Sequence, residues 1–417
     1  MGLQGSRKTG SGAFQPLGTM ESMTTPPDAP GREPGYLDYY RSQGISPVRY
    51  RMANLDEHLD RRDAVYRSLG LPQVAFRGCK VLEVAPGSGQ NSLFIAQAGP
   101  SRYDLVEPNP AGIKDIQKLY GEYADAVVLP NLHTVTLEDF TADTDFDVVI
   151  CENWLGSRST EQALIGKLAS LVAPGGVLVL TLVPLSGFSS NVLRRLLALR
   201  INNPALPFEE QTDRLVEAFG PHLGTIPNMT RSHEHWVQDC MLNPHYLNVV
   251  LPFDTAREAV GDGMEVLGSA PKFATDWRWF KGLVGAARRF NGEFARNYAE
   301  NIHNFVDYRH VWPPRDAADN ALMEDACRAL HTDALAYEAA LVASSIGGDL
   351  VNAIAGHVRA LGAELHQVSA DVGAALDEFG DVWAKDGLTV GDVAGMGPFA
   401  RLFGRETVYV AFTRQRA

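Results

Sequence analysis

The stretch VLEVAPGSGQNSLFIA, residues 81–96, decides the fold. It reads as a short apolar strand that carries Glu83, then a turn with Gly87 and Gly89, then the start of a helix. Glycine lets the backbone approach a ligand closely, and the first turn of a helix presents unpaired N–H groups. A strand, a glycine-rich turn and a helix in this order predict a ligand-binding edge of an α/β sheet.

Strand and helix patterns alternate on both sides of this stretch. Residues 146–152 form an apolar run with almost no polar interruption, as expected of a strand that is buried on both faces. Alternation of this kind predicts a doubly wound, Rossmann-like parallel sheet. The strands are expected at 80–85, 103–108, within 127–140, at 146–152 and at 177–183, and the helices at 92–98, 111–123 and 160–172.

The composition divides the rest of the chain into further segments. Residues 1–34 are rich in Gly, Ser, Pro and Thr and are predicted to be disordered, and residues 35–74 are predicted to form two helices. The core is expected at 75–185, and a mainly helical region that covers the substrate at 186–400, with 264–271 as a candidate core strand. Residues 401–417 contain a β pattern that should rejoin the core sheet, because a lone strand needs a sheet.

The overall charge and composition exclude several classes of protein. The formal net charge is −13, whereas nonspecific nucleic-acid and anionic-membrane binders need a basic surface. The basic cluster LRRLLALR, residues 193–200, is expected to be the solvated face of a helix. The scattered cysteines form no Cys-x-x-Cys pair, and no secretory or membrane-spanning stretch is apparent. We therefore expect a cytoplasmic protein without nucleic-acid or membrane partners. Its long Ala-rich helices would suit either a lid or a homodimer interface.

The glycine-rich turn discriminates between two kinds of ligand. A dinucleotide site requires a third glycine, but Gly89 is followed by Gln90, Asn91 and Ser92. A pyrophosphate gains nothing from Glu83, whereas a ligand with a free amino group gains a charge-assisted hydrogen bond. An NAD(P)-dependent oxidoreductase, or a catalytically silent binding protein on the same fold, remains the alternative.

The run from Glu83 to Gly89 resembles motif I of the class I S-adenosylmethionine-dependent methyltransferases. The sequence departs from that family at Ala85, where the first glycine of the motif usually stands. The resemblance extends over residues 75–185 and the terminal strand, and it implies a methyltransferase that uses S-adenosylmethionine as its cofactor.

The same resemblance implies a set of cofactor-binding positions. Glu107, at the end of the second strand, would accept the ribose hydroxyls, and Asp139 would lie near the adenine. The alternatives are that Glu107 is only a solvated strand end and that Asp139 only caps a turn. Residues 146–156 match motif IV. The full set is Glu83, Ala85, Pro86, Gly87, Ser88, Gly89, Asn91, Glu107, Pro108, Asp139, Phe140, Glu152, Asn153 and Trp154.

Candidate catalytic residues lie in motif IV and in the segment 231–249. Glu152 could orient an amine or accept a proton, and His235 or His233 could act as a general base. The alternative is that both histidines are hydrogen-bonded residues of a cap helix. They could also bind a metal together with Asp239, but this spacing is too weak for us to expect one.

Three further residues are candidates for substrate contact. His58 lies on a helix that often closes over the cofactor in the family, and Trp236 lies beside the two histidines. Arg278 belongs to FATDWRWFKG, residues 273–282, where the density of aromatic residues favours packing at a domain interface over a pocket. The sequence thus predicts O- or N-methylation of a small molecule enclosed by a helical cap.

Overall fold

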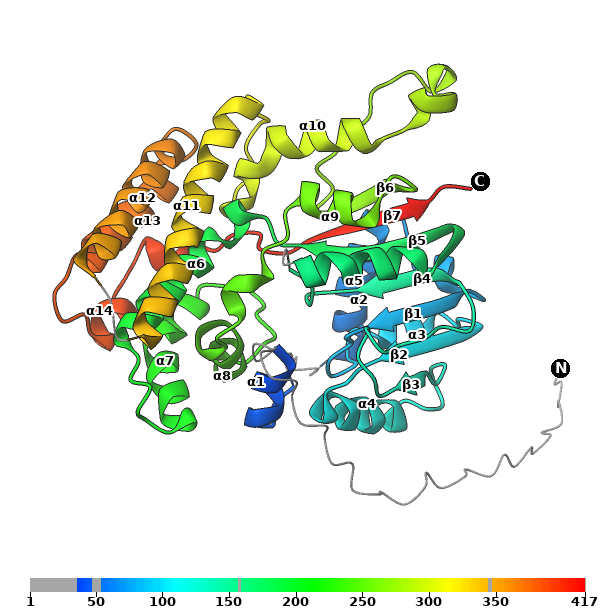
Figure 1. Ribbon diagram of the computed structural model, residues 1–417, viewed down its shortest axis with the longest axis horizontal. Coiled ribbons are helices and arrows are strands. Elements are labelled where there is room, and N and C mark those ends of the chain that lie inside the picture. The colour runs from blue at the N-terminus through cyan, green and yellow to red at the C-terminus, as the bar shows by residue number, and fades with distance from the viewer. Residues whose placement is uncertain (1–35, 47–53, 157–158, 344–346, 417) are drawn as a thin grey trace, which may run out of the picture. The chain divides into compact units, whose positions relative to one another are not determined.

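A seven-stranded sheet with the order β3-β2-β1-β4-β5-β7-β6 forms one side of the protein, on the right in Figure 1. The computed structural model describes residues 36–46, 54–156, 159–343 and 347–416, so the expected disorder of residues 1–34 lies outside the described residues. The strands are β1 (Lys80–Val84), β2 (Arg102–Val106), β3 (Asn131–His133), β4 (Phe146–Cys151), β5 (Val172–Leu182), β6 (Met264–Ala270) and β7 (Val408–Arg414).

The first five strands confirm the predicted doubly wound sheet. Strands β1 to β5 pair in parallel, and β2 and β4 flank β1 on opposite sides. The strand order therefore reverses at β1, and such a switch point is where doubly wound sheets bind ligands. Strand β7 lies between β5 and β6 and is antiparallel to both.

Helices cover both faces of the sheet, as the apolar run of β4 predicts. Val148 and Ile150 of this strand pack with residues of α2 (Leu55–Ser68), α3 (Leu93–Gln97) and α4 (Pro110–Glu122). Val149 and Cys151 belong to the cluster on the other face, with residues of α5 (Ser159–Ser170) and α9 (Phe253–Val260). Alternate side chains of one strand are thus buried in two separate layers.

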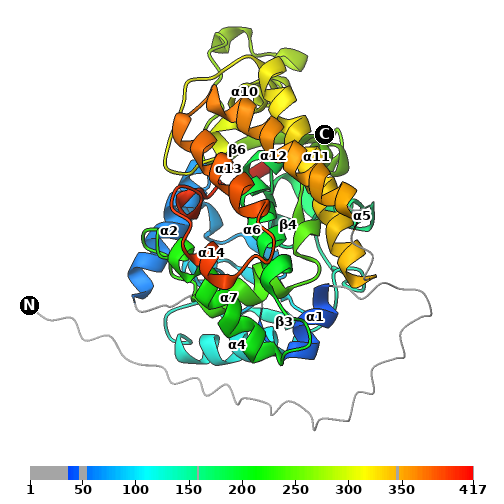
Figure 2. The ribbon, with the colours of Figure 1, turned by 90° about the vertical axis from the view of Figure 1, so that its left-hand side faces the viewer.

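The remaining helices form a block beside the sheet, and residues 35–417 together make one compact unit. In Figure 2, α12 and α13 lie in front of α6, and α11 contacts both α6 and α12. The helices of the block are α6 (Leu185–Ile201), α7 (Phe208–Leu223), α8 (His233–Trp236), α10 (Asn291–Asn301), α11 (Ala317–Val342), α12 (Gly348–His366), α13 (Ala370–Trp383) and α14 (Val390–Ala394). A π-helix spans Val237–Leu242, α1 spans Tyr36–Gln43, and 3₁₀ turns span Gln73–Phe76, Tyr246–Val249, Phe280–Gly282, Gly285–Arg288, Ile302–Phe305 and Phe399–Arg401.

The expected boundaries differ from the structure in three places. Strand β5 begins at Val172, before the Pro-Gly-Gly turn, and its register with β4 shifts there. Strand β3 has only three residues, and α3 only five. No helix in the described ranges is long and apolar enough to cross a membrane.

The expectation that residues 193–200 form a solvated basic face is wrong. Helix α6 is buried along almost its whole length, and Arg194 and Arg195 are 0% and 3% exposed. The Arg194 guanidinium donates to the carbonyls of Leu402 and Phe399, at 2.8 and 3.1 Å. Arg195 pairs with Glu338 of α11. Buried arginines persist here because distant segments supply acceptors for them.

Candidate active site

The turn after β1 adopts a conformation that favours glycine. Gly87 and Gly89 have φ angles of +59° and +76°, and Ala85 has a φ of +57° although it carries a side chain. Gly112 of α4 packs so closely that a Cβ there would lie 2.7 Å from the Gly87 carbonyl oxygen. The alanine at the first motif position therefore keeps the turn, at the cost of a left-handed conformation that L-residues disfavour.

Glu83 lies at the end of β1 with its carboxylate buried. Ser92 Oγ donates to Glu83 Oε1 at 2.9 Å, and the Tyr103 hydroxyl donates to the other oxygen. Burial and the nearby Glu152 carboxylate together raise the pKa of Glu83 to about 7, against the lowering effect of these two hydrogen bonds. Its contact with a ligand amino group stays a prediction.

Glu107 connects the end of β2 to the same turn. The backbone N–H of Gly87 donates to Glu107 Oε2 at 2.9 Å, and that of Asn109 donates to Oε1 at 2.8 Å. Burial raises the pKa of Glu107 to about 7, against the lowering effect of these two hydrogen bonds. Because each carboxylate oxygen has two acceptor sites, both oxygens can still accept a ribose hydroxyl. The residues present thus fit the cofactor that the resemblance implies.

Glu152, directly after β4, forms a buried ion pair that the sequence reading did not include. Arg62 Nη2 lies 2.6 and 2.8 Å from the two Glu152 oxygens, and the Tyr66 hydroxyl donates to Oε1 at 2.7 Å. Both partners belong to α2, one helical turn apart. Both oxygens of Glu152 are thus engaged within the protein, so this geometry speaks against Glu152 as the proton acceptor.

The N-terminal helices lie along the edge of this site. His58 Nε2 contacts the carbonyl of Gln90 at 3.1 Å, which places His58 against the β1 turn and not in a substrate pocket. Arg41 of α1 donates to the carbonyl of Pro108 at 3.1 Å, and Asn109 Nδ2 donates to the carbonyl of Ile45 at 3.2 Å.

The other predicted cofactor residues lie at the same edge of the sheet. Asp139 is exposed and accepts a hydrogen bond from Thr136 Oγ1 at 3.0 Å, within the turn that precedes it. Phe140 is buried beneath it, with its ring 5.1 Å from that of His133. Pro86 and Asn91 are half-buried, Ser88 is buried, and Trp154 packs against the core.

A pocket of about 430 Å³ opens beside the end of β4. Asn153, the second residue after β4, lines it and has a left-handed φ of +55°. The helical block and the segment before β7 supply the opposite walls. Five aromatic side chains line the pocket: Tyr40, Phe188, Trp236, Tyr246 and Tyr409.

Two carboxylates also line this pocket, and their partners differ. Asp239 is paired with Arg231 at 2.6 Å and accepts from the Tyr40 hydroxyl at 2.5 Å. Glu406 accepts a hydrogen bond from Asn191 Nδ2. Burial raises the pKa of Glu406, and Arg231 lowers it in part.

Several predicted acceptor-side residues lie elsewhere. His233 and His235 belong to α8, but only Trp236 of that helix lines the pocket, so the geometry does not support a histidine base. Within the described ranges, no three His, Cys, Asp or Glu side chains could hold a metal ion. Arg278 pairs with Asp276 in an exposed loop and does not line this pocket, so the pocket gives no support to Arg278 as a substrate contact.

Arg62, Tyr66 and Glu406 are not among the residues that the sequence predicts for the site. The first two stand four residues apart in a helical pattern, and that spacing could have suggested one polar face. Glu406 carries no such signal, because the fold brings it to β4 from the other end of the chain.

Comparisons with known proteins agree with this geometry. Residues 53–220 match the family described as "Methyltransferase domain". The probable protein arginine N-methyltransferase 6 of Arabidopsis thaliana is 28% identical over 174 residues, which are 40% of this chain and 37% of that protein. The chain thus matches little more than a third of that relative's length.

Solved structures show weaker similarity. Magnesium protoporphyrin IX methyltransferase from Synechocystis PCC 6803 with bound S-adenosylhomocysteine has a TM-score of 0.35 and 18% identity, over 58% of this chain and 91% of that chain. N-methyltransferase NodS from Bradyrhizobium japonicum WM9 has a TM-score of 0.28 and 17% identity, over 35% of this chain and 74% of that chain. Similarity at this level carries no conclusion about the acceptor. Residues 53–220 of this chain thus match a methyltransferase domain, on a sheet whose first five strands are parallel and doubly wound.

Proposed function

We propose that this protein transfers a methyl group from S-adenosylmethionine to a small molecule that enters the pocket beside Asn153. One observation carries the proposal: Asn153 follows β4 at the switch point of the sheet and also lines the pocket. The cofactor, when bound, supplies an electrophilic methyl group. The protein then contributes mainly proximity and alignment, which methyl transfer to a good nucleophile requires.

The walls of the pocket favour an acceptor that carries an amino group. Aromatic rings attract cations through their faces, and a carboxylate adds a charge-assisted hydrogen bond. The Asp239 carboxylate is already paired with Arg231, whereas Glu406 has an amide as its partner. Glu406 therefore offers the acceptor a negative charge. These features support N-methylation over O-methylation.

Glu406 also suits the proton transfer that N-methylation needs. An acceptor bound as an ammonium ion must pass one proton to a base before its neutral amine can attack the methyl carbon, and the methylated product then carries the positive charge. A carboxylate with a raised pKa accepts that proton readily near neutral pH. Thr407, its neighbour, places its Oγ1 3.5 Å from Asn153 Oδ1, so this wall reaches the end of β4.

The Arabidopsis relative is named for methylation of protein arginine, and a guanidinium is also a cation. A capped pocket suits a free amine better than a folded protein, so an arginine-containing peptide belongs in the acceptor screen as the rival substrate.

Calorimetric titration with S-adenosylhomocysteine, and in parallel with NADH, tests the cofactor. We expect micromolar binding of S-adenosylhomocysteine alone, weakened roughly 10- to 100-fold in Glu107→Ala because two hydroxyl contacts are lost. Glu122→Ala, at an exposed position of α4, is the matched control and should bind normally. NADH binding in place of S-adenosylhomocysteine would favour an oxidoreductase.

The acceptor class is tested by release of S-adenosylhomocysteine from S-adenosylmethionine across a panel of amines, phenols and arginine peptides. With the best amine, Glu406→Gln should lower turnover roughly 10²- to 10⁴-fold and leave S-adenosylhomocysteine binding unchanged. The exposed Glu258→Gln of α9 serves as the control. Turnover with phenols and not with amines would contradict the role of Glu406.

A further inference from the structure

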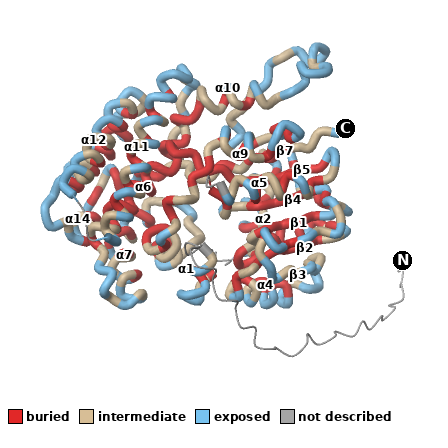
Figure 3. Tube along the Cα trace, viewed as in Figure 1, coloured by how far each residue is buried: buried red, intermediate tan, exposed pale blue. Residues whose placement is uncertain are grey.

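The loop between β6 and α10 exposes large apolar side chains. We call residues 276–289 the Trp loop. Trp277 is 92% exposed, Trp279 67%, Phe280 64% and Val284 71%. Figure 3 shows the loop mostly in the colour of exposed residues, and in Figure 1 it extends past the end of α10. The expectation that these aromatics seal an internal interface is wrong, because they face solvent.

The charge of the Trp loop is opposite to that of the whole chain. Residues 277–289 contain four cationic side chains and no Asp or Glu, whereas the chain has 50 acidic and 37 basic residues. The adjacent acid, Asp276, is held by Arg278 at 2.6 Å. The exposed cations Lys281, Arg288 and Arg289 therefore accompany the aromatic side chains without a compensating carboxylate on the loop.

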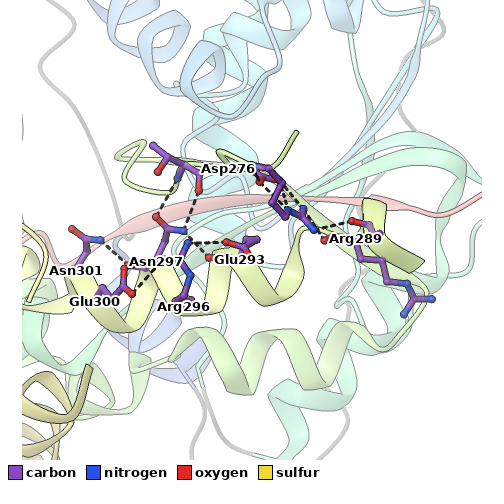
Figure 4. Close-up of polar contacts among 10 residues, drawn as sticks. Asp276, Arg289, Glu293, Arg296, Asn297, Glu300 and Asn301 are labelled. Carbon is purple, nitrogen blue, oxygen red and sulfur yellow. Dashed lines mark hydrogen bonds and ion pairs between the residues drawn. The ribbon is translucent and has the colours of Figure 1, made fainter. Parts of the chain in front are cut away.

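Polar contacts close the base of the Trp loop. Arg278 donates to the carbonyls of Ala287 and Arg289, at 2.8 and 3.0 Å. Asn297 of α10 accepts from the Thr275 N–H at 3.2 Å and donates to the Thr275 carbonyl at 3.1 Å. Figure 4 shows these contacts, with Asn297 on α10 and Asp276 above that helix. The loop is thus ordered at its base, so binding to a partner surface would not carry the entropy cost of ordering the whole segment.

We propose that the Trp loop docks this protein on an anionic lipid bilayer, with Trp277, Trp279 and Phe280 in the interfacial layer and the neighbouring cations against lipid phosphates. Tryptophan favours the membrane interface because its ring is apolar and its N–H is polar. Clustered Lys and Arg side chains add attraction to anionic lipids.

A bilayer suits this surface better than a protein partner does. A stable protein interface buries about 800 Å² on each side over a broad patch, whereas this surface is one short loop. The chain's net negative charge does not oppose docking strongly, because salt screens charges beyond about 8 Å and the loop would approach the bilayer first. The expectation of no membrane partner rested on that net charge and on the lack of a membrane-spanning stretch, and a loop that docks at the bilayer surface needs no such stretch.

Flotation with vesicles tests this proposal on the full chain. Vesicles of phosphatidylcholine with 30% phosphatidylglycerol are compared with vesicles of pure phosphatidylcholine. We expect binding to the anionic vesicles that weakens at high salt. The double variant Trp277→Ser, Trp279→Ser should lower the partition coefficient at least tenfold, because both rings leave the interfacial layer. Arg288→Gln with Arg289→Gln should weaken binding to the anionic vesicles only.

The double variant Val311→Ser, Val342→Ser is the matched control, since these side chains are 82% and 86% exposed away from the loop. Every variant should bind S-adenosylhomocysteine as the wild type does, which shows that each is folded. Three results would overturn the proposal: no flotation of the wild type, flotation that the Trp→Ser variant retains, or a dimer in sedimentation that the Trp→Ser variant abolishes without any vesicle binding.

Discussion

At the scale of single residues, Glu83 links the site to the pH dependence of folding. Its pKa rises from an ordinary 4.5 to about 7 in the folded protein, because burial disfavours the charged form. The folded state therefore binds the proton more tightly than the unfolded state. The stability from this group is present below pH 4.5 and is lost as the pH rises to about 7, roughly 3 kcal/mol in all.

Glu83→Gln removes this titration, because the amide is neutral at every pH. Relative to the wild type, the variant's free energy of unfolding should rise by up to about 3 kcal/mol between pH 4.5 and 8. Urea unfolding of both proteins without cofactor, at several pH values, measures that difference. The exposed Glu122→Gln should show a flat difference, and a flat difference for Glu83→Gln would contradict the buried titration.

Individual residues also show what a sequence can predict about a site. Glu83, Gly87 and Glu107 were predictable because the site is built on short strand-to-turn segments. Glu406 was not, because its place in the pocket depends on β7 entering the sheet from the far end of the chain. Ala85 lies between these cases: its position was predictable, but its left-handed backbone was not.

At the scale of elements, helix α6 depends on a buried guanidinium. Arg194 donates to the Leu402, Phe399 and Ala400 carbonyls, and its charge lies 3.6 Å from the centre of the Phe403 ring. Burial lowers the pKa of Arg194 to about 9. The arginine joins α6 to the segment that leads into β7.

Arg194→Met should destabilise the protein by roughly 2–4 kcal/mol, because buried carbonyl groups lose their donors. Thermal and urea unfolding measure the loss. Arg67→Met of α2, whose side chain is 71% exposed, should stay within about 0.5 kcal/mol of the wild type. Equal stability of the two variants would mean that the guanidinium of Arg194 contributes only packing.

The same helix explains why some elements were predicted and others misread. The places of β1 to β5 along the chain follow from local apolar patterns, so the sequence predicts them well. The burial of α6 has no local signal, because its acceptors lie about 200 residues further along the chain. Charged residues indicate a solvated face only where no distant partner is available.

At the scale of the whole molecule, the helical block is required to complete the sheet. Hydrogen bonds connect the segment before β7 to three separate parts of the chain. Arg194 of α6 donates to the Leu402 carbonyl, and Glu378 of α13 accepts from the Phe399 N–H at 2.7 Å. Arg405 of this segment donates to the carbonyl of Tyr308 at 2.8 Å. Strand β7 then pairs with both β5 and β6. Sheet and block should therefore unfold together.

Hydrogen exchange under increasing urea tests this coupling. Val410 of β7 and Phe379 of α13 are both fully buried. Val410→Ala should cost roughly 2 kcal/mol and Phe379→Ala roughly 3–5 kcal/mol. The segment before β7 connects the sheet to the helical block, so a loss of stability in one should destabilise the other. Each variant should therefore lower the opening free energy of amides in β1 and in α13 by the same amount. If Phe379→Ala lowers protection in α13 and leaves β1 unchanged, the block opens by itself. The pocket walls that the helical block supplies would then open while the sheet stays folded, and an acceptor could enter through that opening.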